Sequence, residues 1–406
     1  MSKILAIFLT MIIAISACAI NVDASSTTMT GFINAYKQGD FEKADKIAKK
    51  LPKKAKSYNS KMSSGMKNAY LKKILATSNV ELYYLADLTG DKKPELFIKK
   101  GTCEANYKYY VFKYSKGKTV RIGKFDGGHS YLADYPGEKS ILCVFGHMGD
   151  EQIYLIQLKN GKTKRIKLNG RDCQYSDYTK VPYELKSYNC GSYNKYNLYP
   201  FAIKNTKAVK TAKKRLNKLV KRINPAIINF YPKTKKLNLT KKNKIILAAI
   251  SIHEADSNSS NGAAGKTVFK KNYIKKEYKN LFSGKPSFKS LAKKYKKHTK
   301  SSMGNEVYRW GKLIAGNISG LYLAPNNSDS TYDFALPTNA RVECIRKIKG
   351  GYRIAVTHYM RGYYEWESPA DEDVCFAHTL IDVKKNSKSK YKYAIKKINS
   401  IVYCKH

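Results

Sequence analysis

The segment Leu85-Ala86-Asp87-Leu88-Thr89-Gly90-Asp91-Lys92 recurs 47 residues later as Leu132-Ala133-Asp134-Tyr135-Pro136-Gly137-Glu138-Lys139. An offset of this size suits one four-stranded, blade-like antiparallel sheet. The chain from 80 to about 202 alternates short β runs with turn residues, which also predicts a β-meander. Two or three such units are too few to close a ring, so we expect an open stack of blades or a compact barrel-like meander. The alternative is a chance alignment of a common turn.

The regions on either side of this meander follow helical periodicity. Residues 28–78 place apolar side chains at helical spacing and predict a helical hairpin that turns at Gly39-Asp40. After the meander come a basic helical segment, further helices, and strands over the last hundred residues. The sequence therefore predicts an α+β multidomain protein: an N-terminal helical hairpin, an antiparallel β-meander with blade-like repeats, and a domain of helices plus an antiparallel sheet. The expected boundaries are a signal peptide at 1–24, a helical segment at 25–78, the β-meander at 79–204, a basic helical linker at 205–239 and the α+β domain at 240–406.

The N-terminus has the pattern of a signal peptide. Lys3 precedes an apolar run over residues 4–15 that is too short to span a bilayer. Cleavage after Ala24 is the preferred route, and the alternative is a lipobox in which Cys18 is acylated. Both routes place the protein outside the cytoplasmic membrane, so we expect it to be extracellular or in the cell envelope.

The balance of charge is strongly basic. The chain has 77 Lys and Arg residues against 30 Asp and Glu residues, a formal net charge of +47. Such a protein carries a positive field that attracts polyanions and that salt screens. For an exported protein we expect the partners to be anionic cell-wall polymers or polysaccharide, or a membrane surface, and we expect no nucleic acid. The alternative is a solvated lysine-rich surface without a particular partner.

Seven cysteines follow Cys18, and an odd number cannot all pair within one chain. Cys173 and Cys190 flank a polar, Tyr-rich segment, where a disulfide would stabilise the fold by about 3 kcal/mol on loop-entropy grounds. We name this pair as the candidate disulfide. No CxxC spacing occurs, so a structural zinc site is not indicated.

The first copy of the repeated segment contains most of the clearest candidate site. Asp87, Thr89 and Asp91 carry oxygen atoms on alternate residues, and Glu95 is a further oxygen ligand for a calcium ion. The stronger interpretation is a β-turn stabilised by hydrogen bonds of the Asp side chains, because nearby lysines weaken a cation site. We otherwise expect no cofactor.

In the residues Asp87-Leu88-Thr89-Gly90-Asp91-Lys92-Lys93-Pro94-Glu95-Leu96 the sequence resembles the loops of FG-GAP and VCBS repeat proteins. It is also similar to uncharacterised exported proteins of Gram-positive gut-type bacteria with the pattern Asp-x-x-Gly-Asp-x-x-Pro-Glu-Leu. The resemblance covers mainly residues 80–160. It implies a blade-like β repeat and a calcium-binding loop. Thr89 departs from the Asp or Asn of the family pattern, and Lys92 from its usual Gly.

A search for catalytic groups finds no constellation that stands out, so no catalytic residue is named. His253, Glu254 and Asp256 close a predicted helix, but no second His follows at the HExxH spacing. His129 and His147 are predicted to lie in adjacent strands, either as a shared site or as structural histidines. An acidic island surrounds Trp366, and we expect it to offset the local lysine excess; the alternative is that it receives a cationic partner.

These features favour an exported, non-enzymatic surface protein that binds anionic envelope polymers or glycans through lysines and tyrosines. Two alternatives stay open. One is an envelope-associated hydrolase, and the other is a solute-binding lipoprotein anchored through Cys18.

Overall fold

The computed structural model describes residues 28–52, 58, 61–136, 138–172, 174, 178–190, 196–230, 238–256, 267–288, 296–300, 307–315, 318–324, 339–361 and 373–403. The protein is an α+β multidomain protein with helices at its N-terminal end and antiparallel sheets, as the sequence predicts. Contacts divide it into two compact units. The N-terminal unit comprises the described residues up to Ala69 and from Glu81 to Tyr188, and the C-terminal unit those from Tyr70 to Val80 and from Asn189 onward.

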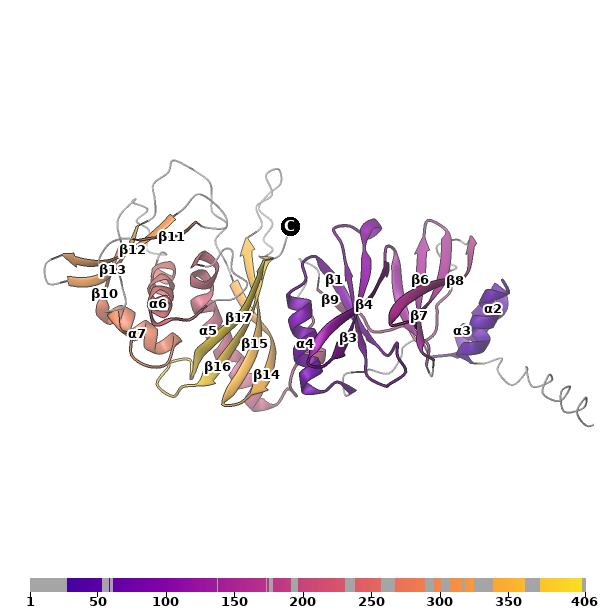
Figure 1. The fold of residues 1–406 in the computed structure, drawn as a ribbon, viewed down its shortest axis with the longest axis horizontal. Coiled ribbons are helices and arrows are strands. Elements are labelled where there is room, and N and C mark those ends of the chain that lie inside the picture. The colour runs from indigo at the N-terminus through magenta and orange to yellow at the C-terminus, as the bar shows by residue number, and fades with distance from the viewer. Residues whose placement is uncertain are drawn as a thin grey trace, which may run out of the picture. The chain divides into compact units, whose positions relative to one another are not determined.

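Two antiparallel sheets form the centre of the N-terminal unit (Figure 1). The first has the strand order β4-β3-β2-β1-β9 and the second β5-β6-β7-β8. The strands of the first sheet are β1 Val80–Ala86, β2 Glu95–Lys100, β3 Lys108–Ser115, β4 Lys118–Asp126 and β9 Tyr188–Asn189, with a short 3-10 helix η3 at Glu104–Asn106. The strands of the second sheet are β5 Ser130–Asp134, β6 Ser140–His147, β7 Asp150–Lys159 and β8 Lys162–Asp172.

The internal repeat therefore corresponds to structure. Each copy of the repeated segment begins in the first strand of a four-stranded meander, β1 or β5, and leads into the turn before the second strand. Leu85 lies near the end of β1, and Leu132 lies in β5. Apolar side chains of both sheets form one shared core, which includes Phe97 and Val111 from the first sheet and Ile141 and Ile156 from the second. Alternate residues of β6 point to the other face of the second sheet, as the period of two in a strand requires.

The helical hairpin covers that other face. Helices α2 (Met29–Lys37) and α3 (Phe41–Lys50) are joined at Gly39, which has a φ of +76° that suits a residue without Cβ. Thr28 and Asp40 cap the two helices, since each side chain accepts a hydrogen bond from the backbone N–H three residues on. The next helix, α4, spans Ser64–Leu75.

The C-terminal unit packs helices on a four-stranded antiparallel sheet, β14-β15-β16-β17. Its helices are α5 Lys207–Phe230, α6 Lys241–Asp256 and α7 Lys271–Leu281, with a 3-10 helix η5 at Tyr199–Phe201. The strands of this sheet are β14 Asn339–Ile348, β15 Gly351–Arg361, β16 Asp373–Lys385 and β17 Tyr393–Tyr403. A second sheet has the order β10-β13-β12-β11, with β10 Thr267–Lys270, β11 Lys296–Lys300, β12 Val307–Ala315 and β13 Ile318–Ala324.

Two expectations need correction here. Helix α5 is part of the core of the C-terminal unit rather than a linker, because it buries apolar side chains such as Leu216 and Ile223 against the sheet. Residues 286–297, which start with a Pro suited to a first helical turn, are also predicted from the sequence as a helix. That prediction is wrong at its described ends, since 286–287 are not helical and β11 begins at Lys296. In α5 the many lysines obscured the helical spacing of the buried apolar residues.

Candidate polyanion-binding surface

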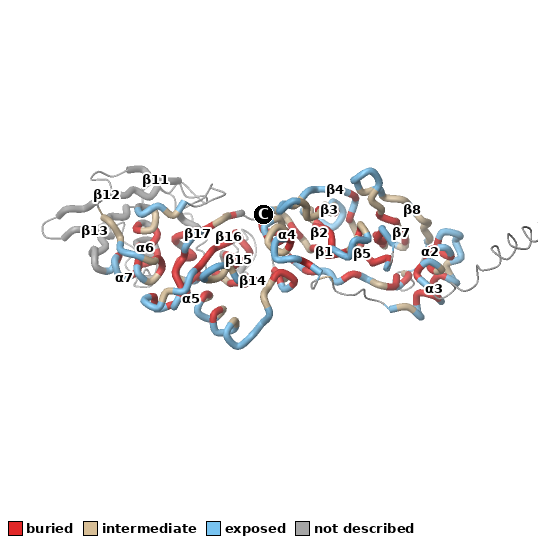
Figure 2. The backbone as a smooth tube through the Cα atoms, turned by 60° about the horizontal axis from the view of Figure 1, so that its bottom comes forward, coloured by how far each residue is buried: buried red, intermediate tan, exposed pale blue. Residues whose placement is uncertain are grey.

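Helix α5 carries a row of lysines on its exposed side. The helix has 24 residues and contains no acidic residue. Its buried residues recur at helical spacing and belong to the core of the C-terminal unit, and exposed residues alternate with them along the helix (Figure 2). Five exposed lysines recur three or four residues apart: Lys207, Lys210, Lys214, Lys218 and Lys221. We call these five residues the α5 lysine stripe.

Two other basic residues of α5 interact with acidic side chains of the protein. Arg222 donates to Glu277 with a distance of 2.7 Å between Nε and Oε1. Burial raises the pKa of the Glu343 carboxyl group, and Lys213 lies close enough to lower it in part. Among the described residues, the lysines of the stripe have no acidic partner. Their positive charges are therefore available to a ligand.

The N-terminal unit combines lysine with tyrosine on its first sheet. Tyr110 lies between two lysines, with Lys100 Nζ at 5.6 Å and Lys124 Nζ at 5.5 Å from the centroid of its ring. Tyr110 and Lys124 are directly opposite each other on β3 and β4. Cation–π contacts of this kind hold an ammonium group at an aromatic ring without neutralising its charge.

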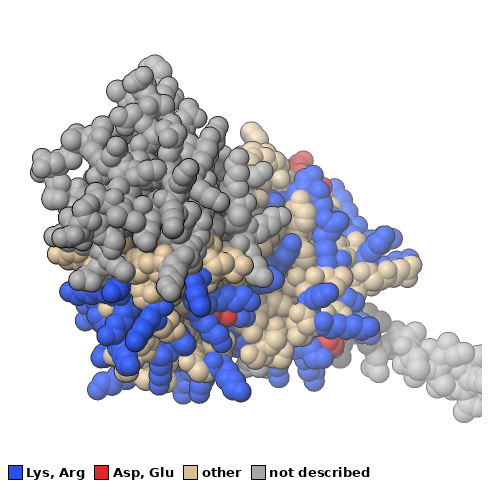
Figure 3. Space-filling model, turned by 60° about the vertical axis from the view of Figure 1, so that its left-hand side comes forward, with Lys and Arg blue, Asp and Glu red and all other residues tan. Residues whose placement is uncertain are grey.

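Basic side chains also dominate the described surface on the face drawn in Figure 3. On the face drawn in Figure 3, blue Lys and Arg side chains cover much of the described surface, and red Asp and Glu side chains occupy only small areas. The ion pairs of the described residues use several of the acidic side chains, such as Glu42, Asp91 and Asp126. The acidic side chains are too few to offset the basic ones, since the chain has 77 Lys and Arg residues against 30 Asp and Glu residues.

The predicted calcium loop is a turn in which Asp side chains accept hydrogen bonds from backbone N–H groups of the same turn. Asp87 accepts hydrogen bonds from Gly90 N at 2.8 Å and Lys92 N at 2.6 Å, and Asp91 accepts one from Lys93 N at 2.8 Å. Gly90 and Lys92 have positive φ angles of +73° and +62°. Within the described part of the chain, no group of three or more His, Cys, Asp or Glu side chains could hold a metal ion. Calcium binding stays a prediction.

Glu95, the first residue of β2, is buried and contacts Thr89 of this turn. The carboxylate of Glu95 is 4% exposed and accepts hydrogen bonds from Leu88 N at 2.8 Å and from Thr89 Oγ1 at 3.4 Å. Burial raises the pKa of Glu95 to about 7, and the negative charges of Asp87 and Asp91 add to the effect. In the second repeat copy, Asp134 is buried and accepts a hydrogen bond from Tyr58 Oη at 2.9 Å. Asp87 and Asp134 occupy equivalent positions of the repeat, but Asp87 accepts hydrogen bonds from backbone N–H groups and Asp134 accepts one from a tyrosine.

The two histidines that the sequence places in adjacent strands do lie together. The rings of His129 and His147 stack with centroids 3.6 Å apart and an interplanar angle of 18°. Glu104 Oε1 lies 3.4 Å from Nδ1 of His129. Parallel rings at this separation cannot both direct a nitrogen lone pair at one metal ion, so the geometry fits structural histidines.

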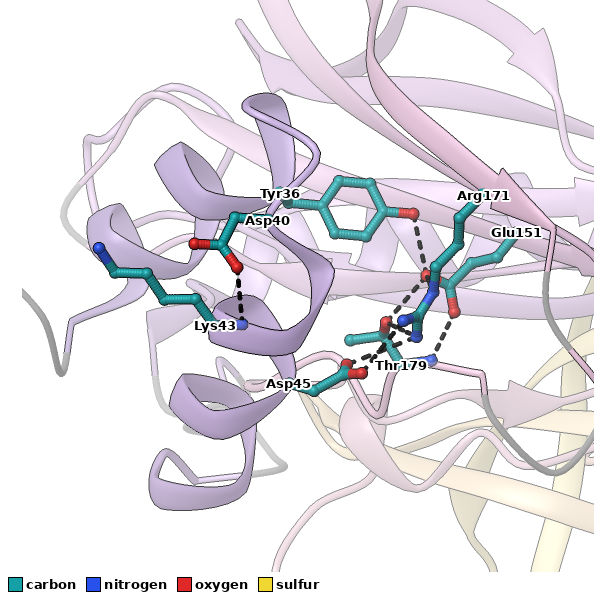
Figure 4. Close-up of polar contacts among 7 residues, drawn as sticks. All are labelled: Tyr36, Asp40, Lys43, Asp45, Glu151, Arg171 and Thr179. Carbon is teal, nitrogen blue, oxygen red and sulfur yellow. Dashed lines mark hydrogen bonds and ion pairs between the residues drawn. The ribbon is translucent and has the colours of Figure 1, made fainter.

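A buried polar network in the N-terminal unit was not foreseen (Figure 4). Glu151 is 1% exposed and accepts hydrogen bonds from Tyr36 Oη at 2.9 Å and from Thr179 Oγ1 at 2.8 Å. Arg171 pairs with Glu151 at 3.3 Å and with Asp45 at 3.1 Å. The network ties α2 and α3 to the second sheet, so its role is to fasten the hairpin.

A second unforeseen cluster lies on the sheet of the C-terminal unit. His358 is fully buried and contacts Asn224 Oδ1 of α5 at 2.6 Å and Thr379 Oγ1 at 2.7 Å. Burial lowers the pKa of His358 to about 3, with a smaller effect from His378. On the neighbouring residue of β16, His378 contacts Thr357 Oγ1 at 3.2 Å and Cys375 Sγ at 3.3 Å. The contact between His358 and Asn224 holds α5 on the sheet and thereby orients the lysine stripe.

Several predictions fall on residues that the structure does not describe. The signal peptide, Cys18 and Cys173 lie outside the described residues, as does the acidic island around Trp366, and the side chains of His253, Glu254 and Asp256 are not described. Cys190 is buried, and its disulfide with Cys173 stays a prediction. None of the described helices is both long and apolar enough to cross a membrane.

Comparison of the chain with protein-family models, with curated proteins and with solved structures gave no significant match. The resemblance of the Asp87 loop to FG-GAP and VCBS repeats therefore stays a prediction, and the candidate function rests on the surface itself.

Proposed function

We propose that this is an exported, non-enzymatic protein that binds anionic polymers or glycans of the cell envelope through its lysine-rich surface. The observation that carries the proposal is the excess of 77 basic over 30 acidic residues in the chain. An excess of this size raises the local concentration of polyanions at the surface and speeds their association.

Two features of the described surface support the proposal. Lysines without an acidic partner occur in both units, on α5 and beside Tyr110. The pairing of Tyr110 with lysines also suits a polymer that contains sugars, because an aromatic side chain offers an apolar surface and lysines meet phosphates or carboxylates.

The test is retention of the purified protein on isolated cell walls, with and without their anionic polymers, at about 50 mM and about 300 mM salt. We expect retention that requires the polymers and falls at the higher salt concentration. Equal retention on stripped walls, or retention that salt does not change, would contradict the proposal and favour the hydrolase or the solute-binding lipoprotein.

A further inference from the structure

We infer that the ligand of the C-terminal unit is a linear polyanion that lies along α5 and contacts the lysine stripe with successive charges. The inference rests on the proposed function and deepens it, because it names the shape of the ligand and the element that binds it. The chemistry that fits is an extended phosphodiester polymer, which carries one negative charge in each repeat.

The positions of the five lysines make a straight row along the helix. With 100° per residue, their directions around the helix axis fall within an arc of about 80°. At 1.5 Å per residue the row from Lys207 to Lys221 is about 21 Å long. The lysines thus present positive charges every 4.5 to 6 Å, roughly, along one side of α5.

The spacing of charges in the polymer is comparable. Three backbone bonds of an extended peptide span about 3.3 to 3.6 Å, so a polymer with six backbone bonds per phosphate repeats every 7 Å or so. The stripe is therefore about as long as three such repeats, which carry four phosphates. Lysine side chains are flexible and adjust to the small difference in spacing.

The orientation of α5 argues against a membrane as the ligand. Amphipathic helices that lie in a membrane interface bury their apolar side among the lipids. In α5 that side is already occupied, because Ala212, Leu216, Leu219, Val220 and Ile223 pack in the core of the C-terminal unit. Only the polar side of α5 is available to a ligand, and the lysine stripe runs along it.

The surroundings of the helix keep this row in place. Asn217 accepts a hydrogen bond from Val342 N at 2.8 Å, and Asn224 contacts His358 and Asn339. Arg222 pairs with Glu277 of α7. These contacts fix the rotation of α5 about its axis, so the stripe faces outward before any ligand arrives.

The experiment compares two variants with the same change in charge. In the stripe variant, five substitutions remove the row: Lys207→Gln, Lys210→Gln, Lys214→Gln, Lys218→Gln and Lys221→Gln. In the control variant, five exposed lysines of the N-terminal unit are changed instead: Lys118→Gln, Lys159→Gln, Lys162→Gln, Lys164→Gln and Lys167→Gln. All ten side chains are exposed, so both variants are expected to keep the thermal transition of the unaltered protein.

Binding is measured with synthetic oligo(glycerol phosphate) of two, four and eight repeats, and with vesicles that contain anionic lipid. We expect affinity to rise steeply up to about four repeats and more slowly beyond, since the stripe is then filled. The stripe variant should lose at least about 30-fold in affinity for eight repeats, and the control variant less than about 3-fold.

Equal losses in the two variants would overturn the inference while leaving general polyanion binding intact. Tighter binding to vesicles than to eight repeats, with the same loss in the stripe variant, would also overturn it and assign the stripe to a lipid surface. Absence of binding by the unaltered protein to any of these probes at low salt would contradict the proposed function itself.

Discussion

At the scale of single residues, Glu95 carries the clearest electrostatic consequence of burial. Its pKa is raised from 4.5 to about 7, so the folded protein favours the protonated form. Between pH 4.5 and 7 the unfolded chain ionises Glu95 while the folded protein keeps it protonated, so the free energy of unfolding falls as pH rises. Above pH 7 this decrease is complete. A shift of this size corresponds to about 3 kcal/mol.

We predict that Glu95→Gln removes this decrease in the free energy of unfolding. Glutamine keeps an acceptor for Leu88 N and contacts Thr89 without a charge. The free energy of unfolding, measured with urea between pH 4.5 and 8, should match the unaltered protein at pH 4.5 and exceed it at pH 8. A variant that is less stable than the unaltered protein at pH 8 would show that the charge of Glu95 stabilises the fold.

Calcium gives a second readout on the same residue. If Asp87, Thr89, Asp91 and Glu95 hold a calcium ion, millimolar calcium at pH 8 raises the melting temperature of the unaltered protein and has a smaller effect on Glu95→Gln. If the loop is a turn alone, calcium has the same small effect on both proteins.

At the scale of elements, the hairpin of α2 and α3 depends on the charged network around Glu151. Removing one hydrogen bond with Tyr36→Phe should cost about 2 kcal/mol in the free energy of unfolding, because the acceptor is charged. Removing the buried positive charge with Arg171→Met should cost about 3 to 5 kcal/mol, because Glu151 and Asp45 lose their cation.

Chemical denaturation of the two variants checks this order. Glu42→Gln is the matched control, since its partner Lys46 and its own side chain are well exposed and the ion pair contributes little. Costs that are small and equal in all three variants would mean that the network does not fasten the hairpin.

Much of the secondary structure could be predicted from local pattern. The strands of both meanders and helices α6 and α7 follow from alternation, helical spacing and turn residues, because each depends on neighbours in sequence. The repeat at Leu85 and Leu132 also predicted that corresponding strands open two sheets. By contrast, the network around Glu151 joins residues such as Tyr36 that are 115 positions away, and no local pattern signals such a contact.

The role of α5 was missed for a different reason. Its basic residues suggested a linker, although Leu216, Leu219, Val220 and Ile223 recur at the spacing of a buried helix face. Giving the apolar period more weight than the charge would have placed α5 in the core. The lysine stripe then follows, because the exposed side is what remains.

At the scale of the whole molecule, charge and fold contribute separately to the proposed function. The net charge of +47 draws polyanions to any part of the surface. The fold adds direction, since it orients the row of lysines on α5 and holds lysines at Tyr110. Binding should therefore combine a general, salt-sensitive attraction with a preference for ligands long enough to span α5.

The most direct test of polyanion binding is the dependence of the binding constant on salt, measured with a long phosphodiester polymer between about 50 and 200 mM salt. Release of counterions from a single-stranded polyanion gives a slope of about −0.7 per contact in a plot of log K against log salt. Four phosphate contacts along α5 predict a slope of about −2.8 or steeper, which is a loss of about 50-fold in affinity over this range. A slope near zero would contradict the account, because binding would then not depend on the lysines.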